Sequence, residues 1–153
     1  MVVKIKVFFI LIILLTALFA VGCSTKTKEE FLGVKATIFK SPQCGCCEGY
    51  SSYLKQKGFD VEMVEMEDLT PIKQKYNIPR NMESCHTTVI GDHFIEGHMP
   101  IEAVKKVLAE DSGVEGIALP NMPAGAPGMP GTKRGTWVIY GISQGVVSEF
   151  MKL

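Results

Sequence analysis

The pattern of hydrophobic and polar residues becomes regular near residue 35. The β-branched and aromatic stretch 35–41 predicts a strand, and the alternating stretch 60–68 predicts a second strand with one solvated face. Between these strands, hydrophobic residues recur at helical spacing over 48–59, and Gly58 marks the end of that helix. A strand, a helix and a strand in this order predict a parallel pair of strands joined by a crossover helix.

The next part of the pattern predicts two helices and a hairpin. Thr70 as N-cap and Pro71 at the first helical position predict a short helix that ends near residue 76. Two hydrophobic stretches between residues 85 and 99 meet at Gly91-Asp92, a dipeptide that favours a β-hairpin when alternating residues flank it. Pro100 begins a third helix, which places four hydrophobic residues on one face: Ile101, Val104, Val107 and Leu108.

The C-terminal part of the pattern begins with a loop. Four prolines and four glycines between Pro120 and Gly135 exclude a regular element there. Two hydrophobic stretches, 137–140 and 146–150, then predict a closing β-hairpin that covers a face or an edge of the main sheet. The whole order predicts an α/β domain over residues 35–153, with a thioredoxin-like mixed sheet flanked by helices, the Pro/Gly-rich loop and the C-terminal hairpin.

The N-terminal segment has a different pattern. Two lysines precede an uncharged hydrophobic run, and small residues and Cys23 follow it. This order is typical of an export signal, and residues 20–23 (Ala-Val-Gly-Cys) resemble the lipobox of bacterial lipoproteins. We therefore predict a lipoprotein signal peptide over 1–22, a lipid on Cys23 and a polar, lipidated tether over 23–34. The alternative is an uncleaved membrane anchor, which needs about 20 apolar residues to span a bilayer.

Net charge and cysteine content narrow the range of possible functions and partners. The chain has 16 basic and 16 acidic residues, and removal of residues 1–22 would take away two lysines and leave a net charge of −2. A nucleic-acid-binding surface needs a basic excess, so we expect no nucleic-acid partner. An exported protein lies where disulfides persist, and the four cysteines other than Cys23 allow two disulfides in three connectivities.

Three of these cysteines lie within four residues, at Cys44, Cys46 and Cys47. A predicted strand precedes them and a predicted helix follows them, so their thiols lie at a helix N-terminus, where the macrodipole favours the thiolate. Cys44 and Cys47 have the C-x-x-C spacing of thioredoxins, but Cys46 stands where the common motif has proline. This change adds a third soft ligand and removes a rigid residue.

Cys85 and His86 form the second half of the predicted site. In a thioredoxin-like fold, the loop before the third strand packs against the cysteine motif and normally presents a cis-proline. Here that position holds Cys85-His86, so we expect both side chains to point toward the three cysteines. Thiolates together with an imidazole suit Cu(I) and Zn(II). We predict a copper(I) site, with silver or zinc as other candidate ions. Cys44 and Cys47 would be its core ligands, and Cys46, Cys85 and His86 would complete or gate it.

Three further residues are weaker candidates for the metal site. His98 lies just before the third helix, although a lone histidine is more often packed or solvated. Met122 and Met129 lie in the Pro/Gly-rich loop, and their thioethers could bind Cu(I). The alternative is that both methionines anchor this loop on the hydrophobic core.

Other interpretations of the cysteines stay open. A Cys44–Cys47 disulfide and a Cys46–Cys85 disulfide could be purely structural, although bridges that involve such a short loop add little stability. Cys44 and Cys47 could also be the attacking and resolving thiols of a thiol-disulfide oxidoreductase. A further class of function is a lipoprotein whose fold serves only as a partner-binding module.

Three sequence motifs resemble the bacterial domain-of-unknown-function family four hundred and eleven, whose members are usually labelled metal-binding or CopG-like copper-resistance proteins. These motifs are residues 39–50 (FKSPQCGCCEGY), 84–100 (SCHTTVIGDHFIEGHMP) and 118–129 (ALPNMPAGAPGM). The resemblance implies an exported protein associated with copper or silver tolerance. By position, eight residues fall in the family's motifs: Cys44, Cys46, Cys47, Cys85, His86, His98, Met122 and Met129.

The residues and the resemblance together predict an extracytoplasmic, membrane-anchored lipoprotein that binds copper(I) or silver through its cysteine cluster. Its role would be sequestration of the metal ion or delivery to another copper protein. We expect a binding protein rather than an enzyme in the ordinary sense. The main alternative is the thiol-disulfide oxidoreductase that uses Cys44 and Cys47.

Overall fold

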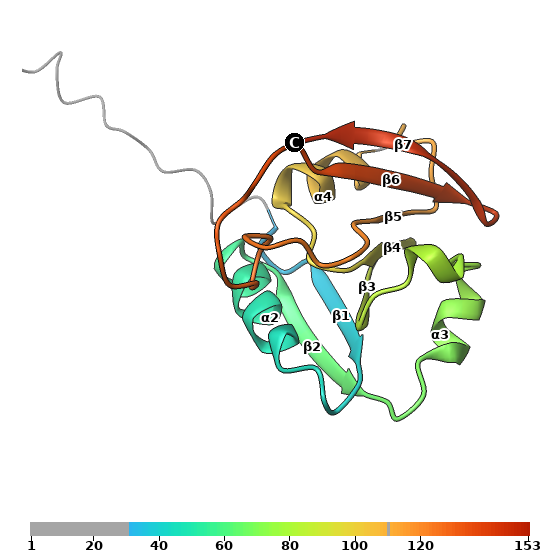
Figure 1. Cartoon of the computed structure of the whole chain (residues 1–153). Helices are drawn as coiled ribbons and strands as arrows, with labels where there is room; N and C mark the ends of the chain where they lie inside the picture. The colour runs from blue at the N-terminus through green and yellow to red at the C-terminus, as the bar shows by residue number, and fades with distance from the viewer. Residues whose placement is uncertain (1–30, 110) are drawn as a thin grey trace, which may run out of the picture.

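The computed structural model describes residues 31–109 and 111–153 (Figure 1). The predicted signal peptide, the predicted lipid site at Cys23 and residues 23–30 of the predicted tether lie outside the described residues. The described part of the tether reaches the folded core, because Phe31 is buried and stacks on Phe59 with ring centroids 4.3 Å apart. The folded domain therefore includes Phe31, four residues before the predicted boundary.

A single mixed sheet of seven strands runs through the fold in the order β2-β1-β3-β4-β5-β6-β7 (Figure 1). The strands are β1 (Lys35–Lys40), β2 (Asp60–Glu65), β3 (His86–Ile90), β4 (His93–Glu96), β5 (Gly116–Ala118), β6 (Val138–Ser143) and β7 (Val146–Lys152). β1 pairs parallel with β2 and antiparallel with β3, which pairs antiparallel with β4. β5 is parallel to β4, and the antiparallel strands β6 and β7 close the sheet.

The helices cover both faces of this sheet. They are α2 (Cys46–Gln56), α3 (Thr70–Lys75), a short 3-10 helix (Arg80–Met82) and α4 (Ile101–Val107). α2 and α4 pack on one face, where Ile95 of β4 and Ile117 of β5 belong to the main hydrophobic core. Phe94 and Ala118 point to the opposite face, because neighbouring residues of a strand alternate, and the segment after α3 packs there.

Most of the predicted order of elements is present. The parallel pair β1 and β2 has its crossover helix, the hairpin of β3 and β4 turns at Gly91-Asp92, and α4 follows Pro100. The predicted mixed α/β class is therefore confirmed. No regular element interrupts the Pro/Gly-rich loop between β5 and β6, as its composition predicted.

Two details of the prediction are wrong. Thr70 is not the N-cap of α3: Leu69 holds that position, and the Asp68 carboxylate accepts the Thr70 backbone N–H at 2.8 Å. The side chain that accepts a backbone N–H at the start of α3 is thus Asp68, two residues before Thr70, and not the Thr70 hydroxyl. The short strand β5 was not predicted, because three residues carry too little periodicity to be recognised.

β5 also decides where the C-terminal hairpin lies. β5 adds to the edge of the sheet at β4, and β6 then pairs with β5, so the hairpin extends the sheet edge rather than covering a face. The predicted strands 137–140 and 146–150 correspond to β6 and β7, which are each longer than expected. The backbone of Trp137 pairs with that of Leu153 and closes the end of this hairpin.

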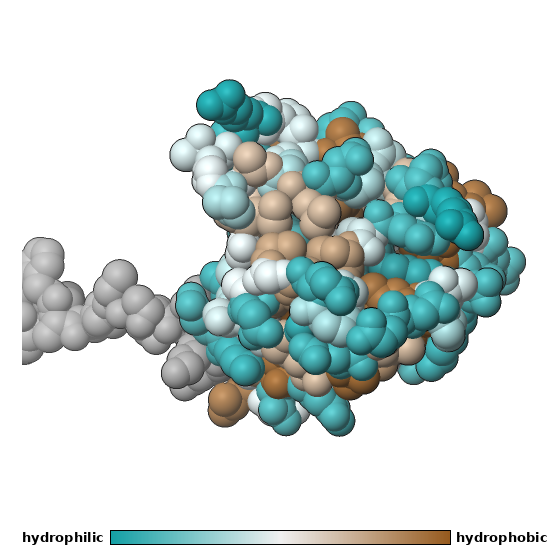
Figure 2. Space-filling model, turned by 60° about the horizontal axis from the view of Figure 1, so that its bottom comes forward, coloured by the Kyte–Doolittle hydropathy of each residue, from teal (hydrophilic) through white to brown (hydrophobic). Residues whose placement is uncertain are grey.

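The face shown in Figure 2 is largely hydrophilic, with hydrophobic residues in small separate groups. Among the described residues, the large hydrophobic side chains that are strongly exposed are Leu32 and Val146. Within residues 31–109 and 111–153, no helix combines the length and the hydrophobicity that a membrane crossing requires.

Candidate metal centre

The three clustered cysteines lie between the end of β1 and the first turn of α2. α2 begins at Cys46, so Cys46 and Cys47 occupy its first turn and Cys44 precedes it in the loop. Cys47 is fully buried and Cys44 is 6 % exposed, whereas Cys46 is only half-buried. The loop therefore turns two sulfur atoms inward and leaves one at the surface.

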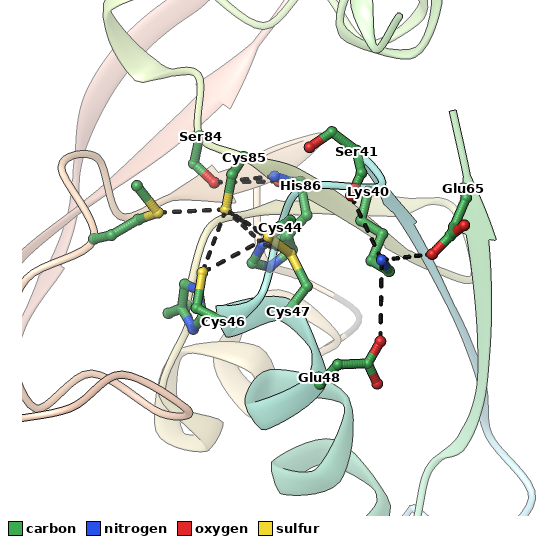
Figure 3. The surroundings of a disulfide bond; sticks show 12 residues. Lys40, Ser41, Cys44, Cys46, Cys47, Glu48, Glu65, Ser84, Cys85 and His86 are labelled. Carbon is green, nitrogen blue, oxygen red and sulfur yellow. Dashed lines mark hydrogen bonds and ion pairs between the residues drawn. A yellow bond between two sulfur atoms is a disulfide. The ribbon is translucent and has the colours of Figure 1, made fainter. Parts of the chain in front are cut away.

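Cys85 meets this loop from the opposite side (Figure 3). It directly precedes β3, and the antiparallel register of β1 and β3 sets His86 opposite Lys40 at the end of β1. The Cys85 Sγ lies 3.1 Å from the Cys44 Sγ, 3.8 Å from the Cys46 Sγ and 3.9 Å from the Cys47 Sγ. The four sulfur atoms all lie within 4.8 Å of one another, as a shared metal site requires.

One of the two disulfides of the structural alternative is present. Cys44 and Cys47 form a disulfide, and Cys46 and Cys85 are free thiols. The second bridge of the purely structural interpretation, Cys46–Cys85, is absent, and these two sulfur atoms stay 3.8 Å apart. Since only thiolates bind soft metals strongly, Cys44 and Cys47 can join a four-sulfur site after their disulfide has taken up two electrons.

Two buried histidines extend the cysteine cluster into the core. The His86 Nδ1 lies 3.4 Å from the Cys47 Sγ and 3.6 Å from the Cys85 Sγ. The ring of His98 meets the ring of His86 edge-on, with centroids 4.9 Å apart. Cys85, His86 and His98 form a second group whose ligand atoms all lie within 4.8 Å of one another.

The tautomer of His98 follows from its hydrogen bond. Its Nδ1 lies 2.7 Å from the carbonyl oxygen of Pro127, which can only accept, so Nδ1 carries the hydrogen and donates it. The lone pair is then on Nε2, which is buried and has no hydrogen-bond partner among the described residues. A backbone carbonyl that fixes the ring of a histidine in this way is the usual support of a metal ligand.

Burial sets the protonation of these groups. It raises the pKa of the Cys85 thiol to about 12, and the neighbouring Cys46 adds to the rise. It lowers the pKa of His86 to about 3, with further lowering by His98 and Lys73, and it also lowers the pKa of His98. At neutral pH both imidazoles are therefore uncharged, and Cys85 would have to release a proton to bind a metal ion.

The Pro/Gly-rich loop brings Met122 to the cluster. The Met122 Sδ lies 3.4 Å from the Cys85 Sγ. Asn121 and Met122 both have positive φ, 66° and 42°, a conformation that is uncommon for residues other than glycine and that often occurs at functional sites. Met129, in contrast, packs against the main hydrophobic core. Met122 therefore lies at the cysteine cluster and Met129 in the core, although both were equal candidates from the sequence.

A close approach of two backbones holds this loop on α2. A Cβ atom on Gly49 would lie 2.7 Å from the carbonyl oxygen of Gly128, and one on Gly128 would lie 2.6 Å from the carbonyl carbon of Gly49. Both positions therefore need glycine. Gly128 follows Pro127, the residue that fixes His98, so the same contact supports both the loop and this histidine.

Sequence reasoning missed the charged residues around the cluster. Lys40, at the end of β1, is buried and its Nζ lies 2.8 Å from the Glu65 carboxylate (Figure 3). Lys73 of α3 and Glu96 of β4 form a second, more deeply buried ion pair beside Cys85. Nothing in the local pattern distinguishes these residues from ordinary surface charges.

Comparisons with known proteins relate the chain to one family. The family model described as protein of unknown function DUF411 matches residues 82–129, which include Cys85, His86, His98, Met122 and Met129. Two solved structures of copper resistance protein CopG, Form 1 and Form 2, each match with a TM-score of 0.72 and 30 % identity, over 79 % of this chain and 98 % of the CopG chain. The chain belongs to the DUF411 family of CopG-like proteins.

The membership in the DUF411 family confirms the resemblance that the three sequence motifs carried. No curated protein matches the chain. The likeness to CopG extends well beyond the segment that the DUF411 model matches, because it covers most of the chain.

Proposed function

We propose that this DUF411 protein binds copper as Cu(I), or silver as Ag(I), through the cysteine cluster and holds it for sequestration or delivery. One observation carries the proposal: four cysteine sulfur atoms from two distant segments lie within 4.8 Å of one another. The related solved structures are named copper resistance proteins, which supports copper as the metal.

The chemistry of the donor set favours a soft ion. Thiolates and a thioether suit Cu(I), and uncharged imidazoles complete the set, whereas carboxylates, the usual ligands of hard cations, are absent from the two donor groups of the described residues. Cys46, Cys85 and Met122 are only half-buried, while Cys47 and His86 are fully buried. A metal ion would therefore arrive at the first three residues and be shielded by the others.

The cellular setting is part of the proposal. An export signal and a lipid on Cys23 would place the domain outside the cytoplasm and attach it to a membrane. There, a reductant must first convert the Cys44–Cys47 disulfide to two thiols with two electrons and two protons. Delivery to another copper protein would then proceed by exchange of ligands at the half-buried Cys46 and Cys85.

A metal titration tests the proposal. The full chain, purified in detergent and fully reduced, is titrated with Cu(I) against a competing chelator, and bound metal and free thiols are counted. We expect retention of at least about one ion per chain and protection of Cys46 and Cys85 from alkylation. A reduced protein that loses all its copper to the chelator would refute copper binding at this cluster.

The disulfide itself favours a second function. Cys44 and Cys47 have the C-x-x-C spacing of a thiol-disulfide oxidoreductase, which in its dithiol form would reduce a substrate disulfide to two thiols and return to the Cys44–Cys47 disulfide. However, Cys44 is 6 % exposed and Cys47 is fully buried, so a thiol of a large partner has little access to either sulfur atom. An insulin-reduction assay on the same preparation decides between the two functions.

A further inference from the structure

A buried ion pair lies directly behind the segment that presents Cys85. Lys73 of α3 is 4 % exposed and Glu96 of β4 is fully buried, and the Lys73 Nζ contacts the Glu96 Oε1. Burial of two charges costs a large desolvation free energy, and apolar residues of similar size often serve stability as well or better. A gain in stability therefore does not explain why this ion pair is buried, and another role is needed.

Lys73 uses all three of its hydrogen-bond donors. Besides Glu96, its Nζ donates to the Thr87 Oγ1 at 2.9 Å and to the Ser84 carbonyl oxygen at 3.1 Å. An ammonium group has three N–H donors, so no capacity is left over. The lysine thus links α3 to two residues of the segment that begins β3.

Glu96 completes the same network from the other side. Its Oε2 accepts the Thr87 hydroxyl at 2.7 Å, and its Oε1 accepts the backbone N–H of Ser84 as well as Lys73. The Thr87 hydroxyl accepts from Lys73, so its single hydrogen must go to Glu96. Because every neighbour of the carboxylate donates, the network fits the ionised form of Glu96.

The network holds the two residues that flank the metal-binding dipeptide. Ser84 precedes Cys85-His86 and Thr87 follows it. The segment from Glu83 to Cys85 belongs to no helix or strand, so Cys85 lacks a regular ladder of backbone hydrogen bonds. The position of the Cys85 sulfur atom thus depends on how firmly Ser84 and Thr87 are held.

We propose that Lys73 and Glu96 are positioning residues that set Cys85 and His86 against the cysteine loop for metal binding. This inference rests on the proposed copper-binding function. The ion pair touches no ligand atom and acts through Ser84 and Thr87. Supporting residues of this kind typically change metal affinity by about 10–100-fold when they are replaced.

The test is a double variant, Lys73→Met with Glu96→Leu, made in the full chain and purified in detergent. Both replacements are apolar and of similar length, so the fold is expected to persist. The matched control is Lys35→Met with Glu62→Leu, which removes an exposed ion pair of 2.7 Å at the opposite end of β1. Both variants are compared with the natural chain in thermal unfolding, amide hydrogen exchange and competition for Cu(I).

The double variant should unfold near the temperature of the natural chain but bind Cu(I) about 10–100-fold more weakly. In the metal-free, reduced protein, the amides of Ser84 to His86 should exchange faster, while those of α2 are unchanged. The Lys35 and Glu62 control should match the natural chain in all three measurements. Natural Cu(I) affinity in the double variant would overturn the proposal, whatever its exchange rates.

A conservative variant separates position from charge. Glu96→Gln keeps an oxygen that accepts from Lys73 and Ser84, so it should retain most of the Cu(I) affinity. If Glu96→Gln loses as much affinity as the double variant with the Ser84 amide still protected, charge rather than position acts and the proposal is wrong. Should the double variant not fold, Thr87→Val removes one link alone and should weaken Cu(I) binding about fivefold, the effect of one ordinary hydrogen bond.

The same design distinguishes failure of the function from failure of this inference. If the natural chain binds no Cu(I), the copper proposal fails, and hydrogen exchange in the metal-free protein still tests whether the ion pair positions Cys85. If the natural chain binds Cu(I) and the Lys73 and Glu96 double variant binds it equally well, the positioning role alone is overturned.

Discussion

The Sγ atoms of Cys85 and Cys44 lie 3.1 Å apart although 41 positions separate the two residues in the chain. The pairing of β1 with β3 produces this contact, because it sets His86 opposite Lys40 and brings Cys85 beside the loop that follows β1. Cys85 is also the one residue shared by the four-cysteine group and the Cys85, His86 and His98 group. Its sulfur atom therefore connects the half-buried thiols with the buried imidazole rings of His86 and His98.

Replacement of this shared residue should cost the most affinity for copper. We expect Cys85→Ser to weaken Cu(I) binding by more than about 100-fold, the upper range for supporting residues, because both donor groups lose a ligand. The Cys46→Ser variant removes one half-buried thiol from one group and should have a smaller effect. Competition titrations of the reduced proteins measure both values. Equal losses in the two variants would contradict a central role of Cys85.

The Cys46→Ser variant also separates the two candidate functions. A redox cycle needs only Cys44 and Cys47, so an oxidoreductase would keep its full insulin-reduction rate after this change. A copper-binding protein would instead lose Cu(I) affinity. An unchanged affinity together with a substantial insulin-reduction rate would favour the oxidoreductase over the copper-binding function.

The two methionines of the Pro/Gly-rich loop should behave differently. Met122 lies 3.4 Å from the Cys85 Sγ, so Met122→Leu should reduce Cu(I) affinity while Zn(II) affinity changes little, because a thioether is a soft ligand. Met129→Leu is the matched control, since Met129 packs against the core. Both substitutions should lower the free energy of unfolding by less than about 1.5 kcal/mol. Equal Cu(I) affinities in the two variants would argue against Met122 as a ligand.

The contact between Gly49 and Gly128 should be essential for the loop. Gly128→Ala places a methyl group against the backbone of α2, whereas Gly135→Ala, at a similar φ of 73° in the same loop, has open space around it. Both variants bear a left-handed backbone cost of about 1–2 kcal/mol. Gly128→Ala should lose about 1–3 kcal/mol more in thermal or urea unfolding, as other overpacked sites do. Equal losses of stability in the two variants would show that the loop can move away from α2 at little cost.

The stability of the metal-free protein should fall at acid pH. The folded pKa of His86, about 3, lies below its unfolded value near 6.5, so between these values the unfolded state binds the additional proton. The contribution of His86 to the free energy of unfolding is therefore fully present above about pH 6.5. It is lost as pH falls toward 3, by at most about 1.4 kcal/mol per pH unit for one proton. The lowered pKa of His98 acts in the same direction, and the raised pKa of Glu96 opposes it.

Urea unfolding at a series of pH values, with a chelator present, measures this dependence. His86→Phe removes the titrating group and keeps a planar ring, so its unfolding free energy should vary less between pH 6.5 and pH 3 than that of the natural chain. The same slope in both proteins would mean that His86 does not carry the acid sensitivity.

The predicted lipid attachment can be tested at Cys23. Cys23→Ala should abolish incorporation of labelled fatty acid. The domain from Phe31 onward does not include this residue, so its Cu(I) affinity should be unchanged. Labelling of the Cys23→Ala variant would contradict the predicted lipoprotein processing.

The local pattern predicted most elements of the fold. Helical spacing after Cys47, the Gly91-Asp92 turn and Pro100 each depend on neighbours in the chain, and the structure has α2, the hairpin and α4 at these places. The three-residue strand β5 could not be predicted, because its conformation depends on partners in β4 and β6. For the same reason, the position of the C-terminal hairpin could not be predicted from the pattern.

From the sequence alone, three cysteines could be placed together at the start of a helix, and Cys85-His86 at the start of a strand. The packing of distant segments was needed to show that Cys85 completes the cysteine cluster and that Met122 reaches it while Met129 does not. The same holds for the ion pair of Lys73 and Glu96 behind Cys85. The reason is physical: periodicity records which face of an element is buried. Contacts between distant elements depend instead on strand order and register, which no single segment encodes.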